Sequence, residues 1–387
     1  MYKVTLDGAY LYHPWMQERC ITEGALTQEV NKNGSCDVSI VLDHPLATSV
    51  LRRKSVLEVI RFDMAGSEKE IYRGVVMNTV EDSNLEMEIQ TEGDLVFFQD
   101  SIIRPFHKTG TDVPGKTTPG DYFRWLVKKH NEQVDDFKQF TVGQVNITGD
   151  AADRERNDYS TTRDVLDELV TASGGYIRTR TEGGMHYIDY LAECETAGNQ
   201  DIRQGQNVID ITKSVKTDDL ATRLIPLGSS TSNNEWPVTI ANVNSGKDYL
   251  EDAEAVKEYG IITKTVSFSD IQDPAKLKEE GEKAFRKING ASVVIDLSAV
   301  DLADAGYDVQ MLRIGEKVPC VAPTYRIDQQ LQITKKVTDL LKPASSKVTL
   351  GGTTLTYTQR QLQESQGRVR YSGDSVITKT QIDNICV

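Results

Sequence analysis

The sequence has no long run of apolar residues. Nowhere do roughly eighteen of them follow one another, as a helix that crosses a bilayer requires. Residues 1–8 also lack the apolar stretch and small-residue cleavage site of a signal peptide. Hydrophobic residues make up 38% of the chain, and its mean hydropathy is −0.42. We therefore expect a globular protein with a buried core, no membrane span and no export by the secretory route.

Cysteine is scarce and scattered, and no two cysteines form a Cys-x-x-Cys pair. The five positions are Cys20, Cys36, Cys194, Cys320 and Cys386. An odd number of widely spaced cysteines supports neither a disulfide framework nor a zinc site. We expect reduced thiols, as in a cytosol.

Basic residues are fewer than acidic ones. The chain has 44 basic and 58 acidic residues, which gives a net charge of −14. Such a chain repels phosphate backbones, and its aromatic residues, 7% of the total, are not interleaved with basic runs. We expect no sequence-specific nucleic-acid partner. The acidity fits a soluble protein, or the wall of a lumen past which DNA slides.

Motifs for metal binding and catalysis are also missing. No His-Glu-x-x-His spacing or nearby cysteine ligand occurs around the five histidines, His13, His44, His107, His130 and His186. No Gly-x-Ser-x-Gly elbow is present either. We expect no catalytic residue, no metal and no cofactor. A triad assembled from distant parts of the chain is not readable from sequence, so that alternative stays open.

The length of 387 residues fits roughly two to four domains. Composition places a β-rich domain at 1–108 and a small α+β domain at 109–203. A second β-rich domain at 204–342 carries a helical insertion at about 229–290, and a polar segment follows at 343–387. The predicted fold class is α+β, predominantly β.

Alternating patterns predict half-buried antiparallel strands. Asn31-Lys32-Asn33-Gly34 separates two β-prone runs and predicts a tight hairpin. The residues expected on buried strand faces are Cys36, Val38, Ile40 and Leu42, then Leu85, Met87 and Ile89, and finally Leu331, Ile333, Lys335 and Val337.

Helix signals interrupt this β pattern. Thr118-Pro119 supplies an N-cap and a first-turn proline, and Thr161 with Asp164 resembles a capping box. Asp273-Pro274 opens a third helix. Its predicted apolar face consists of Leu277, Ala284, Phe285 and Ile288. A further helix is predicted over 356–365 in the polar C-terminal segment.

One short motif matches a nucleotide-binding pattern. The run from Gly110 through Gly115, Lys116 and Thr117 fits G-x-x-x-x-G-K-[ST], the P-loop. Pro119 delays the helix that should begin at the lysine, and no repeated β-α-β pattern follows. We interpret the match as a false positive, although the apolar run 293–296, which ends in aspartate, is of the type that completes a nucleotide site.

A series of weaker motifs carries a family resemblance. These are Ala25-Leu26-Thr27, Asp43-His44-Pro45-Leu46, Arg73-Gly74-Val75-Val76, Trp236-Pro237, the stretches 242–250 and 259–262, Val300-Asp301-Leu302 and the segment 327–340. Their order over about residues 1–345 resembles the prophage endopeptidase tail family of siphophages, whose members look like the central hub protein of the T4 baseplate.

The resemblance implies two β-barrel-like domains, with an α+β domain and a helical insertion between them, closing as a homotrimer into a pseudo-sixfold ring. The implied partners are the distal tail protein ring, the tape-measure protein and a spike or fibre protein. The implied role is a non-enzymatic structural hub of the tail tip that gates DNA passage, located in the virion and assembled in the host cytoplasm.

Two alternatives remain. One is a tail-associated cell-wall lysin or endopeptidase component, although the chain has no Cys/His or zinc-peptidase pattern to which such residues could be carried over. The weaker one is a P-loop nucleotide hydrolase.

Overall fold

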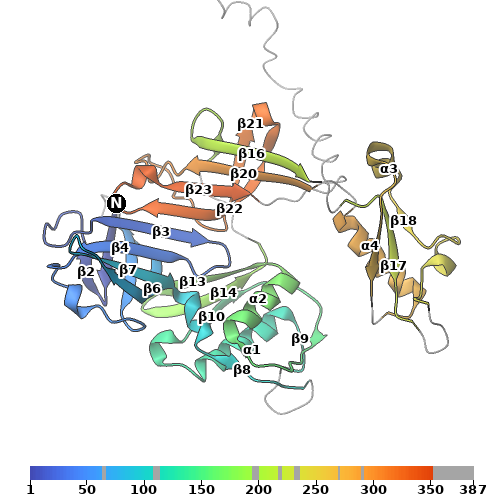
Figure 1. The fold of residues 1–387 in the computed structure, drawn as a ribbon, viewed down its shortest axis with the longest axis horizontal. Helices are drawn as coiled ribbons and strands as arrows, with labels where there is room; N and C mark the ends of the chain where they lie inside the picture. Colours follow the sequence, from blue (N-terminus) through green and yellow to red (C-terminus); the bar gives the residue numbers. More distant parts are fainter. Residues whose placement is uncertain are drawn as a thin grey trace, which may run out of the picture. The chain divides into compact units, whose positions relative to one another are not determined.

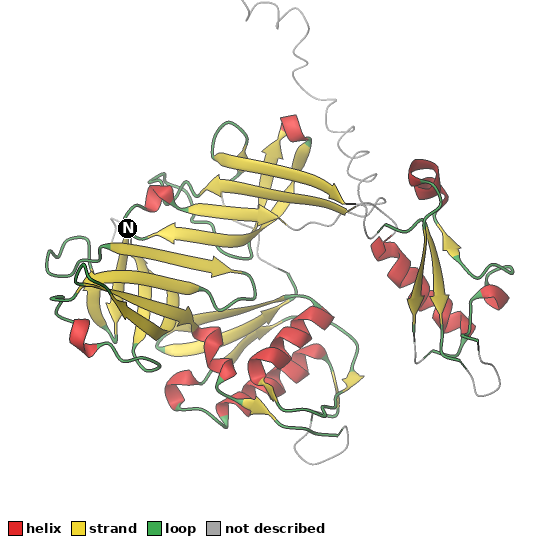
Figure 2. Cartoon of the chain, viewed as in Figure 1, coloured by secondary structure: helices red, strands yellow, loops and turns green. Residues whose placement is uncertain are grey.

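The computed structural model describes residues 1–62, 67–107, 114–193, 200–216, 220–230, 236–268, 271–288 and 292–351. Strands dominate them, as the secondary-structure colouring shows (Figure 2). The predominantly β, α+β prediction is therefore confirmed. The contacts divide the chain into two units, residues 1–211 with 296–352, and residues 212–295. The domain boundaries expected from sequence remain predictions.

Among the described residues, the large sheet contains 13 strands. Their bounds are β1 (Tyr2–Leu6), β2 (Ala9–Tyr12), β3 (Glu23–Glu29), β4 (Ser35–Val41), β5 (Val56–Phe62), β6 (Glu68–Glu81), β7 (Glu86–Gly93), β15 (Ile202–Arg203), β16 (Val208–Lys216), β20 (Ser292–Val300), β21 (Lys317–Ala322), β22 (Ile327–Asp339) and β23 (Lys347–Gly351).

The strand order of this sheet brings strands from residues 1–211 beside strands from residues 296–352, the two parts of the first unit (Figure 1). It runs β16-β20-β23-β22-β3-β4-β7-β6-β5-β1-β2, with β21 paired to β22 and β15 to β21. The central link is the antiparallel pairing of β3 with β22, in register from Glu29 opposite Lys335 to Ala25 opposite Asp339. The path ends at β2 and β16, so the described strands form an open sheet and no closed barrel is detected.

The first hairpin and its neighbouring strands follow the predicted pattern. Cys36, Val38 and Ile40 of β4 are buried, as are Met87 and Ile89 of β7. Side chains at every second position of a strand share a face, so these residues build the core of the sheet. Leu85 was wrongly placed in that series. It is 67% exposed, has a positive φ of 61°, and lies in the turn before β7.

The alternation predicted for β22 holds only in its first half. Leu331 and Ile333 are buried, as expected. The register with β23 then shifts between Ile333 and Lys335, which marks an irregularity of the β-bulge type. A bulge inserts an extra residue and moves the following side chains to the opposite face. Val337 is therefore 37% exposed, while Lys336 is buried, the reverse of the prediction.

The α+β part combines two helices with a small sheet. Helices α1 (Pro119–Asn131) and α2 (Thr162–Ser173) pack against strands in the order β10 (Thr141–Val145), β14 (Met185–Leu191), β13 (Tyr176–Glu182). Both predicted caps are confirmed. Thr118 accepts a hydrogen bond from the amide of Asp121, and Thr161 accepts one from that of Asp164.

Short elements complete the first unit. The two-residue strands pair as β8 (Ile102–Ile103) with β12 (Ser160–Thr161) and β9 (Lys116–Thr117) with β11 (Ala152–Asp153). The 3₁₀ turns are η1 (Ala47–Ser49), η2 (Asp94–Gln99), η3 (Asp136–Lys138), η5 (Pro323–Tyr325) and η6 (Pro343–Ser345). Phe97 and Phe98 of η2 enter the core shared with α1 and α2.

The second unit has a core of its own. Strand β17 (Arg223–Leu227) lies between β18 (Leu250–Glu251) and β19 (Thr263–Ser267). The 3₁₀ turn η4 (Ala241–Val243) and helices α3 (Ala253–Tyr259) and α4 (Pro274–Ile288) complete it. Leu277 and Phe285 of α4 are buried, as the predicted apolar face requires. The helix predicted at 356–365 lies outside the described residues.

Candidate functional site

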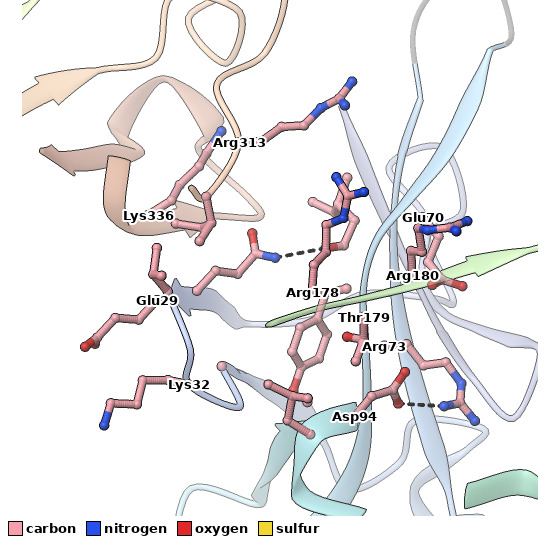
Figure 3. Close-up of a pocket in the computed structure, with 18 of the residues that line it drawn as sticks. Glu29, Lys32, Glu70, Arg73, Asp94, Arg178, Thr179, Arg180, Arg313 and Lys336 are labelled. Atoms are coloured by element: carbon pink, nitrogen blue, oxygen red, sulfur yellow. Dashed lines mark hydrogen bonds and ion pairs between the residues drawn. The ribbon is translucent and has the colours of Figure 1, made fainter. Parts of the chain in front are cut away.

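A cleft of about 810 Å³ lies within the first unit. Most of its lining comes from four segments: the β3–β4 hairpin at 28–34, the start of β6 at 68–73, strand β13, and the loop 311–314 (Figure 3). This volume is in the usual range of binding clefts, roughly 300–1,000 Å³. The lining is rich in charged side chains, so the arrangement of those charges decides what the cleft can bind.

The hairpin is fixed to the α+β part through one asparagine. Asn31 has a positive φ of 60°, a conformation that asparagine tolerates better than most residues. Its side-chain oxygen accepts a hydrogen bond from the amide of Ile177 at 2.8 Å, and its side-chain nitrogen donates to the carbonyl of Gly175 at 3.3 Å. Its own carbonyl accepts one from Arg163 of α2 at 2.5 Å. The hairpin therefore forms a fixed wall of the cleft.

An ion pair lies at the inner end of the cleft. Arg73 of β6 donates to Asp94 at 2.5 Å, and both side chains are buried. Burial raises the pKa of Asp94 to about 7, against the opposing effect of Arg73. Arg73 also donates to the carbonyl of Phe137 at 3.3 Å. Arg73 therefore joins β6 to η2, which contains Asp94, and to η3, which contains Phe137.

Two arginines of β13 share a single buried carboxylate. Arg178 and Arg180 each donate to Asp189 at 2.9 Å, and Asp189 is fully buried. Burial acts to raise the pKa of Asp189, but hydrogen bonds from Arg180, the amide of Gln144 and Arg178 outweigh it and lower that pKa. The carboxylate is therefore ionised at neutral pH. Arg180 also pairs with Glu182 at 2.6 Å, so the two arginines and the two carboxylates balance in charge.

A buried polar cluster supports the wall of the cleft that the loop 311–314 forms. Lys336, turned inward by the bulge in β22, pairs with Asp301 at 2.6 Å and with Asp304 at 2.9 Å. Tyr2 of β1 donates its hydroxyl to Asp304. Burial, reinforced by the Asp304 carboxylate, raises the pKa of Tyr2 far above its ordinary value, so the phenol stays protonated.

The same cluster positions the loop that lines the cleft. Asp301 accepts a hydrogen bond from the amide of Leu312 at 3.0 Å, and Lys336 donates to the carbonyl of Leu312 at 3.3 Å. Gln200 donates both to Asp301 and to the carbonyl of Gln310, each at 3.0 Å. The loop is thus anchored from three directions. Sequence reasoning missed this cluster, although Asp301 belongs to the motif Val300-Asp301-Leu302.

The P-loop match has a different local structure from a phosphate cradle. Gly110 lies outside the described residues. Lys116 and Thr117 form β9 and pair with β11, while Gly115 precedes them with a φ of 59°. Helix α1 begins at Pro119, after the Thr118 cap, and not at the lysine. The false-positive interpretation stays a prediction, and an ATP titration of the chain beside its Lys116→Ala variant tests it.

One serine and one histidine form a pair that sequence could not reveal. The hydroxyl of Ser101 lies 2.7 Å from Nδ1 of His130, and Nε2 of His130 lies 3.0 Å from the carbonyl of Lys138. Burial lowers the pKa of His130, so the ring is neutral and donates to that carbonyl. Ser101 and His130 are 1% and 0% exposed. With a carbonyl in place of the usual carboxylate, the pair has the geometry of a core contact.

Within the ranges given above, no group of three histidine, cysteine, aspartate or glutamate side chains is arranged to hold a metal ion. No helix in the described part of the chain has the length and apolar character needed to cross a membrane.

The fold is similar to that of solved phage tail proteins. It is similar to the prophage MuSo2 43 kDa tail protein from Shewanella oneidensis, at 13% identity and a TM-score of 0.59, covering 90% of this chain and 97% of that one. It is also similar to prophage tail protein gp18 from Listeria monocytogenes, at 13% identity and a TM-score of 0.54, with coverage of 94% and 98%. A tail protein from Neisseria meningitidis matches at 12% identity and a TM-score of 0.55, with coverage of 91% and 96%.

The family match agrees with the fold. Residues 196–361 match the model of the prophage endopeptidase tail family. The resemblance predicted from the sequence is thereby confirmed. No curated protein matches the chain.

Proposed function

We propose that the chain is a structural hub of a phage or prophage tail tip, and that three copies close into a ring joining the tail tube to a spike or fibre. The observation that carries this proposal is the pairing of β3 with β22. Through it, one chain presents strands from its first and last segments as a single continuous sheet. Three such chains supply six β segments, which matches the symmetry of a hexameric tail ring.

The proposed partners follow from this position. The ring docks on the distal tail protein, contacts the tape-measure protein, and carries the spike or fibre on its other face. The protein is then located at the tail tip of the virion and is assembled in the host cytoplasm. The family match and the tail-protein fold support this placement.

The charge of the chain supports a further part of the proposal, the passage of DNA. Three copies at −14 each carry three times that charge, −42. An acidic lumen repels phosphates and lets DNA slide without binding. Replacing lumen-facing acidic residues with lysine is expected to slow DNA ejection from assembled particles. An unchanged ejection rate would count against a gating role.

The oligomeric state tests the hub itself. Light scattering coupled to size exclusion should give the chain alone a mass about three times the 43.1 kDa of one chain, or give its complex with the distal tail ring a mass that exceeds that of the ring by this amount. The distal tail protein alone is the control for the mixed sample. A single copy under both conditions would contradict the proposal. Clearing of peptidoglycan in a zymogram would instead favour the lysin alternative.

A further inference from the structure

The β3–β4 hairpin that lines the cleft contains an Asn-Gly pair, Asn33-Gly34, just before β4. A second such pair, Asn289-Gly290, lies outside the described residues. An asparagine can react with its own backbone, because its side-chain carbonyl carbon and the next amide nitrogen close a five-membered ring. Glycine at the next position makes the approach easiest, since it has no Cβ and adopts conformations closed to other residues. The wall of the cleft therefore contains a pair of groups able to react with each other.

The attacking nitrogen of this pair is not held by the fold. The amide of Gly34 makes no hydrogen bond within the described part of the chain, whereas its carbonyl accepts one from the amide of Gly93 at 3.1 Å. Gly34 has a φ of 72°, in the left-handed region. Asn33 and Gly34 are both partly exposed, so solvent reaches them. An unbonded amide beside solvent can lose its proton to hydroxide and become a nucleophile.

The side chain of Asn33 is restrained from one end. Its nitrogen donates to a carboxylate oxygen of Glu92, on β7, at 2.8 Å. Its oxygen is buried and accepts no hydrogen bond from the residues that the structure describes. A buried carbonyl without a donor has lost its bonds to water and gained none in return, which makes the amide less stable than in solvent. Glu92 is thus the contact that keeps this side chain in place.

The reaction between the two groups needs only water. The nitrogen of Gly34 forms a bond to Cγ of Asn33 and gives its proton to solvent. The bond from Cγ to the side-chain nitrogen breaks, and that nitrogen takes up a proton and leaves as ammonia. Water then opens the cyclic imide at one of its two carbonyl carbons. One opening gives aspartate, and the other gives isoaspartate, whose backbone continues through the side chain.

Both products place a carboxylate where the amide was. The donor to Glu92 is lost, and two negative charges then lie side by side and repel each other. Isoaspartate also adds a carbon to the backbone at a crowded point. The backbone oxygen of Asn33 lies only 2.0 Å from the position that a Cβ atom on Gly93 would take. A contact this close leaves no room for a longer backbone, so the hairpin must move.

We propose that Asn33-Gly34 is a site of spontaneous deamidation, that Glu92 restrains the reaction, and that the modified hairpin moves away from β7 and reshapes the wall of the cleft. The contact that slows the reaction becomes a repulsion once the amide has been converted. Loss of ammonia makes the change permanent. The modification takes place within one chain, so it does not depend on the hub function.

Peptide mapping by mass spectrometry tests the reaction on the full chain, incubated at mildly alkaline pH. Asn33 is expected to convert faster than Asn31 in the same hairpin and than the exposed Asn84, because lysine and leucine follow those two. Asn33→Gln is the control, since a glutamine must close a larger ring and should stay unmodified. Two outcomes overturn the proposal: Asn33 stays intact in the folded chain while it converts in denaturant, or it converts no faster than Asn84.

Glu92 and a second glutamate of β7 supply a matched pair of variants. Glu92→Ala removes the acceptor and is expected to speed the conversion of Asn33 at least about fivefold, the factor that corresponds to the loss of one ordinary hydrogen bond. Glu88 lies on the same strand and the same face, so Glu88→Ala removes an equal charge and should leave the rate unchanged. Equal rates in the two variants would overturn the role assigned to Glu92.

Hydrogen exchange measures the movement of the hairpin. The amide of Gly93 donates to the carbonyl of Gly34, so it is expected to exchange slowly in the unmodified chain. In the isoaspartate fraction, separated by chromatography, the same amide should exchange faster. Asn33→Asp carries the charge without the longer backbone and is expected to show a smaller increase. Unchanged exchange of Gly93 in the isoaspartate fraction would overturn the proposed movement of the wall.

Discussion

Lys336 of β22 holds its ammonium group 2.6 Å from a carboxylate oxygen of Asp301, and both side chains are buried. Removing one partner of a buried ion pair leaves an uncompensated charge, which typically costs about 3–5 kcal/mol. We expect Lys336→Met to lower the free energy of unfolding by about that amount, because Asp301 and Asp304 both lose their cation. Guanidinium denaturation measures the change.

The neighbouring lysine is the matched control for this prediction. Lys335 lies one position earlier on β22 and is exposed. Lys335→Met is expected to change the free energy of unfolding by less than about 0.5 kcal/mol. Equal effects of the two substitutions would mean that the buried Lys336 contributes no more to the free energy of unfolding than the exposed Lys335 does.

His130 gives a prediction about pH. Its pKa is lowered in the folded chain by burial, so as pH falls the unfolded chain binds the proton first. The stability that His130 contributes is therefore present above its unfolded pKa of about 6.5 and is lost as pH falls through the lower folded value. His130→Asn is expected to destabilise the chain more at about pH 8 than at about pH 5. Denaturation at both pH values measures this, and a destabilisation independent of pH contradicts it.

The burial of Ser101 predicts that the Ser101–His130 pair is inert. Ser101 is 1% exposed, so a serine-directed fluorophosphonate cannot reach its hydroxyl in the folded chain. Mass spectrometry after incubation is expected to find Ser101 unmodified, with a serine protease labelled in parallel as the control. Stoichiometric labelling of Ser101 that disappears in His130→Asn would instead revive the enzymatic alternative.

Gly93 predicts a packing defect beside the cleft. A Cβ atom at this position would lie 2.0 Å from the backbone oxygen of Asn33, in the hairpin that lines the cleft. Gly93→Ala must therefore displace the hairpin, and we expect it to lower the free energy of unfolding by about 1–3 kcal/mol. Ser35→Ala on the same hairpin is the control, since it adds no atom. An unchanged melting temperature for Gly93→Ala would contradict the close approach.

Thiol reactivity offers a test of burial in the large sheet. Cys36 and Cys320 are buried, while Cys20 is exposed. Burial raises the pKa of the Cys320 thiol to about 12 and also raises that of Cys36, so neither forms a thiolate at neutral pH. Maleimide is expected to modify Cys20 in the native chain, and Cys36 and Cys320 only in denaturant. Peptide mapping identifies the modified residues. Native labelling of Cys36 would show that the sheet opens.

Local features of the fold were predictable where a residue's own chemistry decides them. The Thr118 and Thr161 caps and the buried face of β4 belong to this group, because short-range hydrogen bonds and strand alternation determine them. The hairpin was also predicted. Its positive φ angles are at Asn31 and Gly34, whereas Asn33, directly before Gly34, has none.

The candidate site was not predictable for two physical reasons. The bulge in β22 has no distinctive sequence, yet it reverses the face of every later residue and turns Lys336 inward. Asp301, Ser101 and Asn31 acquire their roles from partners that are distant in the sequence, 35, 29 and 146 positions away for Lys336, His130 and Ile177. Composition and spacing contain no information about such pairings.

The position of β22 also constrains how the chain reaches this structure. The edge of β3 that β22 covers is made early in synthesis, whereas β22 follows the whole α+β part and the second unit. Until then β3 exposes unpaired backbone groups to other nascent chains. Pairings of such high contact order form slowly, so incomplete copies are at risk of aggregation. Assembly of many identical copies in one cell therefore favours expression slow enough for each sheet to be completed.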